Sequence, residues 1–204
     1  MTQKLTFYTN PMSRGRIVRW MLEELGVQYE TKLLEYDTTM KGAEYLAVNP
    51  MGKVPAIKHG ETIVTECPAI CAYLAEEFPE AKLAPTDHER GAYYRWLFFA
   101  AGPLEQAVFF NMFGVEISKD KEKSLGFGNL QATLDALSAA VSSNTYIAGE
   151  RFTAADVYVG SHIGWSMQFG SLEKRPEFIS YWERISNRAA KLKANEMDNA
   201  LMAK

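Results

Sequence analysis

The chain has 204 residues, a formal net charge of -3 and 47% apolar residues. This composition is typical of a globular protein and excludes a disordered chain, a collagen or a disulfide-stapled miniprotein. The acidic balance gives no basic field to attract nucleic acid or an anionic membrane, and no apolar run approaches the roughly 20 residues that cross a bilayer. We therefore expect a cytoplasmic protein of one or two domains that binds neither nucleic acid nor membrane.

The first 80 residues alternate strand-like and helix-like patterns. The expected elements are a strand at 5–8, a helix that ends at Gly26, strands at 29–34, 56–58 and 62–64, an irregular helix at 39–48, and a helix from Pro68 to Phe78. The order β-α-β-α-β-β-α predicts an α/β domain over residues 1–80, followed by a linker at 81–87.

From His88 onward only helical periods occur, which predicts an all-α bundle over residues 88–204. The expected helices cover 88–113 with a bend at Gly102-Pro103, 121–141, 153–167, 176–187 and a shorter terminal stretch. Thr153 and Asp156 have the spacing of a capping box.

The positions of the cysteines and histidines limit the redox and metal chemistry that the chain can support. Cys67 and Cys71 lie four residues apart in one expected helix, where a disulfide would close too small a loop, so we expect reduced thiols. His59, His88 and His162 are far apart and show no metal-ligand spacing, so we expect no metal site.

Three short strings carry a resemblance that spans essentially the whole chain. They are Ser13-Arg14-Gly15-Arg16, the stretch 49–57 that contains Val54-Pro55, and Thr65-Glu66-Cys67-Pro68-Ala69-Ile70. In this order they resemble the cytosolic glutathione transferases, in particular bacterial, serine-type members similar to the theta and phi branches. The resemblance implies a thioredoxin-like N-terminal domain, a helical C-terminal domain and a homodimer.

The second and third strings predict a glutathione site. Pro55 stands where the family has a cis-proline, and its missing N–H leaves the Val54 peptide available for β-type pairing with a cysteinyl backbone. The helix start at Glu66-Cys67 offers amides to a carboxylate, and Glu66 would face an ammonium. Cys67 replaces the family's usual serine with a weaker donor. Lys41 and Lys53 match positions that contact the glycyl carboxylate.

Ser13 is the expected catalytic residue. A hydroxyl and the amides at a helix N-terminus favour a thiolate over a thiol, so Ser13 would stabilise the glutathione sulfur as the nucleophile. Tyr8 is the alternative, because a tyrosine at the end of the first strand plays this part in other branches. Arg14 could add positive potential or could be a solvated cation.

The second substrate is expected to be a hydrophobic electrophile. The apolar side chains expected to line its pocket between the domains are Met12, Phe109, Met112, Phe113 and Trp165. These residues together predict a detoxifying glutathione transferase, with glutathione peroxidase activity as a further option. The alternatives are a non-catalytic ligand carrier or protein-interaction module of the same fold, and a thiol oxidoreductase that uses Cys67.

Overall fold

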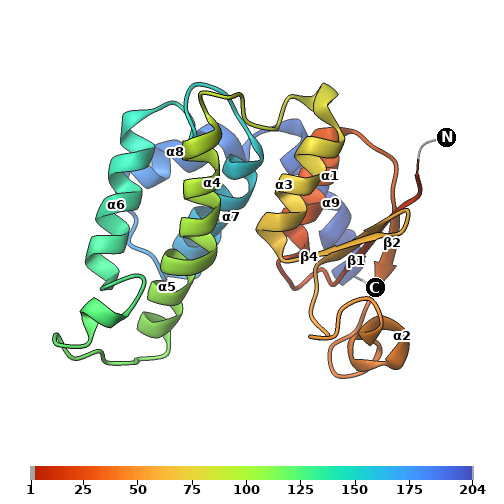
Figure 1. The fold of residues 1–204 in the computed structure, drawn as a ribbon, viewed down its shortest axis with the longest axis horizontal. Coiled ribbons are helices and arrows are strands. Elements are labelled where there is room, and N and C mark those ends of the chain that lie inside the picture. Colours follow the sequence, from red (N-terminus) through yellow and green to blue (C-terminus); the bar gives the residue numbers. More distant parts are fainter. Residues whose placement is uncertain (1–2, 204) are drawn as a thin grey trace. The chain divides into compact units, whose positions relative to one another are not determined.

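The computed structural model describes residues 3–203 (Figure 1). Its contacts divide the chain into two compact units. One comprises the chain up to Leu83 together with the residues from Arg188 onward, and the other comprises Ala84–Asn187. No helix within residues 3–203 is long and apolar enough to cross a membrane.

The first unit is built on a four-stranded mixed sheet with the order β2-β1-β3-β4. Strand β1 is parallel to β2 and antiparallel to β3, and β3 is antiparallel to β4. The elements of this part are β1 Leu5–Thr9, α1 Gly15–Leu25, β2 Glu30–Leu33, η1 Thr39–Lys41, α2 Ala43–Leu46, β3 Ala56–His59, β4 Thr62–Thr65, α3 Cys67–Glu77 and η2 Pro79–Ala81. The predicted order β-α-β-α-β-β-α is confirmed, including the end of α1 at Gly26, which adopts φ 66°.

Neighbouring residues of β1 point to opposite faces of the sheet. Phe7 is fully buried under the guanidinium of Arg19 from α1, which lies 5.2 Å from the ring centroid. Tyr8 packs against Tyr45 of α2 with ring centroids 5.4 Å apart. The sheet is therefore covered by α1 on one face and by α2 on the other.

The terminal helix α9, Ala189–Met202, packs on α1 of the first unit, so that α1 contacts both α3 and α9 (Figure 1). The sequence instead placed residues 188–204 with the helical domain. The physical reason is a buried ion pair between Arg19 and Asp198, with an N···O distance of 2.7 Å and both side chains 1% exposed. Lys191 of the same helix lies over the Trp20 ring at 4.8 Å.

Lys191 makes the stability of this contact dependent on pH. Burial and the nearby charge of Arg16 lower the pKa of Lys191 from 10.5 to about 8. Between pH 8 and 10.5 the unfolded chain holds a proton that the folded chain has lost. The free energy of unfolding therefore increases as the pH is raised from 8 to 10.5, and Lys191 alone contributes about 3 kcal/mol to this increase.

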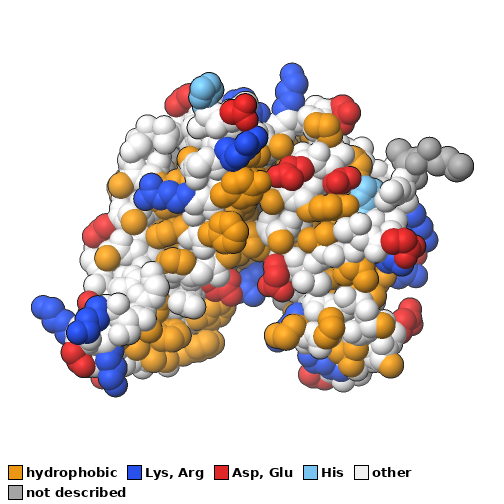
Figure 2. All heavy atoms as spheres, viewed as in Figure 1, with side chains coloured by type: hydrophobic (Ala, Val, Ile, Leu, Met, Phe, Trp, Pro, Cys, Tyr) orange, Lys and Arg blue, Asp and Glu red, His pale blue; other side chains and the backbone are white. Residues whose placement is uncertain are grey.

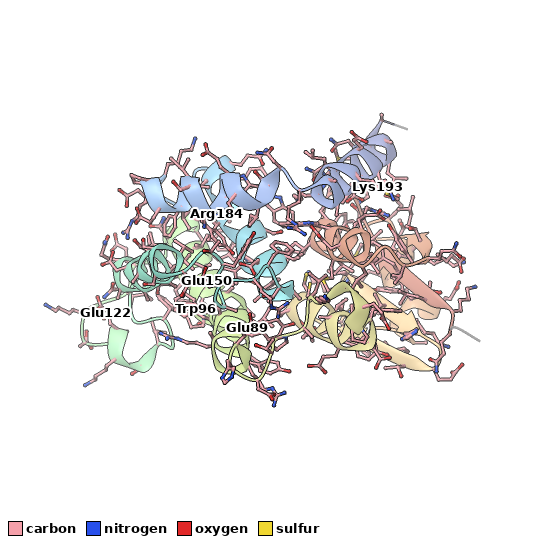
Figure 3. The ribbon with its side chains drawn as sticks, turned by 90° about the horizontal axis from the view of Figure 1, so that it is seen from above. Glu89, Trp96, Glu122, Glu150, Arg184 and Lys193 are labelled. Carbon is pink, nitrogen blue, oxygen red and sulfur yellow. The ribbon has the colours of Figure 1, made fainter. Side chains whose placement is uncertain are left out.

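We expect Lys191→Met to stabilise the protein at pH 7 by about 2 kcal/mol, since it removes a buried charge at the cost of one cation–π contact. The rise in stability between pH 8 and 10.5 should be missing in this variant when urea unfolding is followed against pH. Lys193→Met is the control, because Lys193 lies on the same helix with a side chain that is 67% exposed (Figure 3). Equal pH profiles for wild type and Lys191→Met would contradict the prediction.

The second unit is helical within the described residues. Its elements are α4 Arg90–Phe99, η3 Ala100–Leu104, α5 Glu105–Met112, η4 Glu122–Ser124, α6 Leu130–Ser143, α7 Ala154–Gln168 and α8 Pro176–Ser186. At the position of the predicted bend the chain forms the π-helical turn η3, which contains Pro103, a residue without an N–H for the regular ladder.

The predicted helix over 121–141 is wrong in its first half. Helix α6 begins only at Leu130, where the Asn129 side chain accepts a hydrogen bond from the Ala132 N–H at 2.9 Å. Gly128, with φ 65°, lies just before this cap and adopts a backbone that a helix cannot continue through. The apolar period that includes Phe127 therefore runs past the true start of the helix.

The predicted capping box of α7 is confirmed. The Thr153 N–H donates to Asp156 Oδ2 at 2.8 Å, and the Thr153 hydroxyl donates to the same oxygen at 3.1 Å. The other carboxylate oxygen accepts from the Ile147 N–H at 2.8 Å and from the Tyr181 hydroxyl at 2.7 Å. Asp156 thus joins the start of α7, the preceding loop and α8.

Candidate active site

The strand register brings three segments of the first unit to one edge of the sheet. Tyr8 is paired with Ala56, and Ala56 is paired with Thr65. The loop after β1, which carries Ser13, therefore lies beside the start of β3 after Pro55 and beside the start of α3 after Glu66. The edge brings together most of the side chains that the sequence singled out for glutathione.

Ser13 is half-buried in the turn that leads into α1. Its hydroxyl donates to the Asn10 carbonyl at 2.7 Å and accepts from the Gly15 N–H at 2.9 Å. A Cβ atom at Gly15 would overlap Thr9 Oγ1, so a glycine is needed for α1 to begin this close to the end of β1. These contacts hold the Ser13 oxygen at the N-terminus of α1.

The start of α3 is connected to the start of α1 by a side chain. The Cys67 thiol is buried and donates to the Arg14 carbonyl with an S···O distance of 3.8 Å. Glu66 caps α3 with φ 65°, and its side chain is exposed. Cys71 is fully buried in the same helix. An exposed carboxylate and a buried thiol therefore stand together at the helix N-terminus.

The Val54-Pro55 peptide bond is cis. Pro55 is buried and Val54 is half-buried against the cluster formed by Met40, Tyr45 and Ala56, which Tyr8 also joins. Within residues 3–203 neither the N–H nor the C=O of Val54 makes a hydrogen bond. The peptide keeps both groups available to an extended ligand.

The loop before Val54 is fixed by side chains on both sides. The Asn49 side chain accepts from the Met51 N–H at 3.1 Å and donates to the Lys53 carbonyl at 2.8 Å. The Tyr45 hydroxyl donates to the same carbonyl at 2.6 Å, and burial raises the pKa of Tyr45 to about 12, which keeps this donor protonated. The Lys53 side chain is exposed.

Lys41 reaches this loop from η1. Its ammonium donates to the Gly52 carbonyl at 2.9 Å and to the Met51 carbonyl at 3.2 Å. Gly52 has φ 56°, and a Cβ atom there would lie 2.9 Å from the Lys41 nitrogen. Lys41 and Lys53 therefore place positive charge on either side of the loop, one engaged with backbone oxygens and one exposed to solvent.

The apolar residues expected to contact the electrophile fall in separate units. Met12 in the first unit is 71% exposed. In the second, Phe109 and Phe113 stack along α5 and its end with ring centroids 5.5 Å apart, while Trp165 is half-buried on α7. Figure 2 shows hydrophobic side chains gathered at the α5 end of this unit, where Met112 and Phe113 are exposed.

The described residues, 3–203, contain no group of three or more His, Cys, Asp or Glu side chains placed to hold a metal ion.

Comparisons with known proteins show the family of the chain. Residues 12–77 match the family described as glutathione S-transferase, N-terminal domain, and residues 99–189 match glutathione S-transferase, C-terminal domain. The chain is 30% identical to glutathione S-transferase GstA of Escherichia coli O157:H7 over 72% of this chain and 74% of that protein.

The chain belongs to the glutathione S-transferase family. Its fold matches that of a glutathione transferase from Methylococcus capsulatus strain Bath with a TM-score of 0.78 at 28% identity, over 96% of this chain and 99% of the other. A sphingomonad glutathione S-transferase, solved in complex with glutathione, matches with a TM-score of 0.76 at 26% identity over 95% and 98% of the two chains. The protein is therefore a transferase enzyme with the thioredoxin-like fold of this family.

Sequence reasoning missed two buried asparagines at the candidate site. Asn10 accepts from the Met12 N–H at 2.9 Å and donates to the Leu34 carbonyl at 2.8 Å, in the same way as Asn49 in the other loop. A signal was present, because the string Asn-Pro-Met occurs at both places, at 10–12 and at 49–51. Asparagine before proline favours a turn closed by its own side chain.

Proposed function

We propose that glutathione binds along the edge formed by the Ser13 loop, Val54 and the start of α3. The juxtaposition of these three segments by the strand register is the observation that carries the proposal. The cysteinyl backbone would pair with the open Val54 peptide beside cis-Pro55, as an added strand does. The γ-glutamyl carboxylate would lie at the α3 N-terminus near Cys67, with its ammonium facing Glu66.

We propose that Lys53 and Lys41 bind the glycyl carboxylate. Lys53 is the better placed, because its side chain is exposed while Lys41 is engaged with the carbonyls of Met51 and Gly52. These carbonyls use two of the three ammonium N–H groups of Lys41, which leaves one for a carboxylate.

In the proposed mechanism the Ser13 hydroxyl turns from the Asn10 carbonyl to the glutathione sulfur and stabilises it as a thiolate. The Asn10 carbonyl does not lose its last partner in this step, since the Ser13 N–H also donates to it at 3.1 Å. The thiolate then attacks an electrophilic carbon of a hydrophobic substrate. The new C–S bond either displaces a leaving group as an anion or forms by addition to an activated double bond, whose other carbon then takes a proton from solvent. Arg14 would add positive potential, and Tyr8 remains the alternative hydroxyl.

The electrophile is proposed to be apolar, because the exposed side chains of Met12, Met112 and Phe113 offer no polar group to a ligand. Phe109 and Trp165 are proposed to contact it as well. Reduction of organic hydroperoxides by two glutathiones, which gives the alcohol, water and glutathione disulfide, is proposed as a second reaction of the same thiolate. Detoxification in the cytoplasm and a homodimeric state complete the proposal.

Calorimetric titration tests the binding proposal. Glutathione should bind, whereas cysteinylglycine, which lacks the γ-glutamyl group, should bind at least about tenfold more weakly because it makes no contact at the α3 N-terminus. The ultraviolet absorbance of the bound thiolate should appear near neutral pH. Binding without a thiolate at neutral pH would favour the non-catalytic carrier, and no binding would exclude the proposed site.

The oxidoreductase alternative predicts a different outcome for Cys67→Ser. Both thiols are buried and Cys67 donates to the Arg14 carbonyl, whereas redox-active cysteines are partly exposed. We expect the serine variant to keep its conjugating activity and to bind glutathione about twofold to fivefold more tightly, because a hydroxyl is the stronger donor. Cys71→Ala serves as the control, and loss of activity in Cys67→Ser alone would favour the oxidoreductase.

A further inference from the structure

One side chain joins the Ser13 loop to the terminal helix. Arg16, on the first turn of α1, donates from Nε to the Pro11 carbonyl at 2.6 Å. Its Nη2 donates to Asn199 Oδ1 at 2.9 Å and to the Met202 sulfur at 3.5 Å, both on the last turns of α9. The planar guanidinium can hold both partners at once, because its donors point in fixed directions.

The loop that Arg16 contacts is held at nearly every backbone polar group. The Met12 N–H donates to the Asn10 side chain, the Met12 carbonyl accepts from the Tyr36 hydroxyl at 3.3 Å, and the Ser13 N–H donates to the Asn10 carbonyl. The Pro11 carbonyl is held by Arg16 alone among the described residues. Arg16 is also the charged member of this set, and a charged donor makes a stronger hydrogen bond than a neutral one.

We propose that Arg16 is a positioning residue for the transferase reaction, which orients the Ser13 loop while the end of α9 anchors the guanidinium. This inference rests on the proposed role of Ser13. It makes the last turns of α9 part of the machinery that sets the ionisation of bound glutathione, because they bind the guanidinium that in turn binds the Pro11 carbonyl. Without this contact the loop could shift, and the Ser13 hydroxyl would no longer point at the glutathione sulfur. The pKa of the bound thiol would then rise and the reaction rate would fall.

The charged groups near Arg16 come from two helices. Lys191 and Asp198 of α9 both interact electrostatically with Arg16. Arg14 precedes it at the start of α1. Loss of the Arg16 charge therefore also changes the field at the loop, and this effect has to be separated from loss of anchoring.

Two variants separate anchoring from charge. Asn199→Ala removes the oxygen partner of Arg16 on α9 and leaves the Met202 contact and the Arg16 charge in place. Arg16→Met removes the anchoring contacts and the charge together. Arg188→Met is the matched control, because Arg188 forms an ion pair between α9 and α1 as well, with Glu24 at 2.6 Å, but at the other end of α9. Wild type and Ser13→Ala are measured beside them, each by thiolate absorbance against pH, by calorimetry with glutathione and by kcat and KM.

We expect Arg16→Met to raise the apparent pKa of bound glutathione by about one pH unit and to lower kcat about tenfold, with KM for glutathione changed less than about twofold. Asn199→Ala should give about half of this pKa change, and Arg188→Met should give none. A purely structural role for α9 predicts instead that Arg188→Met and Asn199→Ala act alike.

The outcomes distinguish this inference from the proposed function. If the pKa of bound glutathione in Arg16→Met equals that in wild type, while it clearly rises in Ser13→Ala, the role of Arg16 is overturned and that of Ser13 is left intact. Equal changes in Arg188→Met and Asn199→Ala overturn the anchoring by the last turns of α9. Absence of a bound thiolate in wild type, or a wild-type pKa in Ser13→Ala, overturns the Ser13 proposal and the Arg16 proposal with it.

Discussion

Replacement of Ser13 by alanine is expected to raise the apparent pKa of bound glutathione by about two pH units, which corresponds to about 2.7 kcal/mol. The reason is the loss of one charge-assisted hydrogen bond to the sulfur, whose strength falls in this range. At neutral pH kcat/KM for conjugation should fall by roughly 30-fold to 100-fold, since the thiolate fraction falls with the pKa. Affinity for glutathione should change little, because the backbone contacts proposed at Val54 and the start of α3 do not involve the Ser13 side chain.

Two controls separate chemistry from folding in this experiment. The Ser13 oxygen also accepts from the Gly15 N–H, so alanine removes a helix cap worth about 1 kcal/mol of stability. Ser13→Thr keeps a hydroxyl at this place and should retain most of the activity. Tyr8→Phe tests the other hydroxyl, and a rise in thiolate pKa in Tyr8→Phe with none in Ser13→Ala would transfer the role to Tyr8.

Replacement of Asp156 by alanine is expected to lower the free energy of unfolding by about 5 kcal/mol. The carboxylate is fully buried and accepts from the Ile147 and Thr153 N–H groups and from the Tyr181 hydroxyl. Burial raises the pKa of Asp156, and these hydrogen bonds oppose that rise. Alanine would leave these three donors and the Thr153 hydroxyl, which donates to the same carboxylate at 3.1 Å, without an acceptor, each at a cost of about 1 to 3 kcal/mol.

Urea unfolding of Asp156→Ala and Tyr181→Phe measures this effect. The phenylalanine variant removes a single donor and should cost only about 1 kcal/mol, because the carboxylate keeps its other partners. A loss in Asp156→Ala that is no larger than the loss in Tyr181→Phe would show that the network does not stabilise the helical unit.

The order of elements could be predicted because each signal is local. Gly26 ends α1, Thr153 and Asp156 start α7, and Gly102-Pro103 interrupts the helix that would otherwise run from α4 into α5. The start of α6 was misplaced because Phe127 continues the apolar spacing of the helix although it lies in the loop before it. A buried loop residue and a buried helix residue look alike in the sequence.

The packing of α9 on α1 could not be predicted, because it depends on a contact between residues far apart in the chain. Arg19 and Asp198 each have the sequence character of a solvated charge, and only the folded chain shows that both are buried. The candidate site was more accessible to sequence reasoning. Val54, Pro55 and Glu66 lie in short strings, and the register then places them at one edge; their roles toward glutathione stay predictions.

The two loops that are closed by the side chains of Asn10 and Asn49 also determine how well the site resists deamidation. An asparagine side chain deamidates when the backbone nitrogen of the next residue attacks it, and proline has no N–H to offer in that position. Asn10 and Asn49 are both followed by proline. Conversion of either one to aspartate would set a carboxylate oxygen against the carbonyl of Leu34 or Lys53, where an amide now donates. The proline that shapes each turn thus also preserves the amide that closes it.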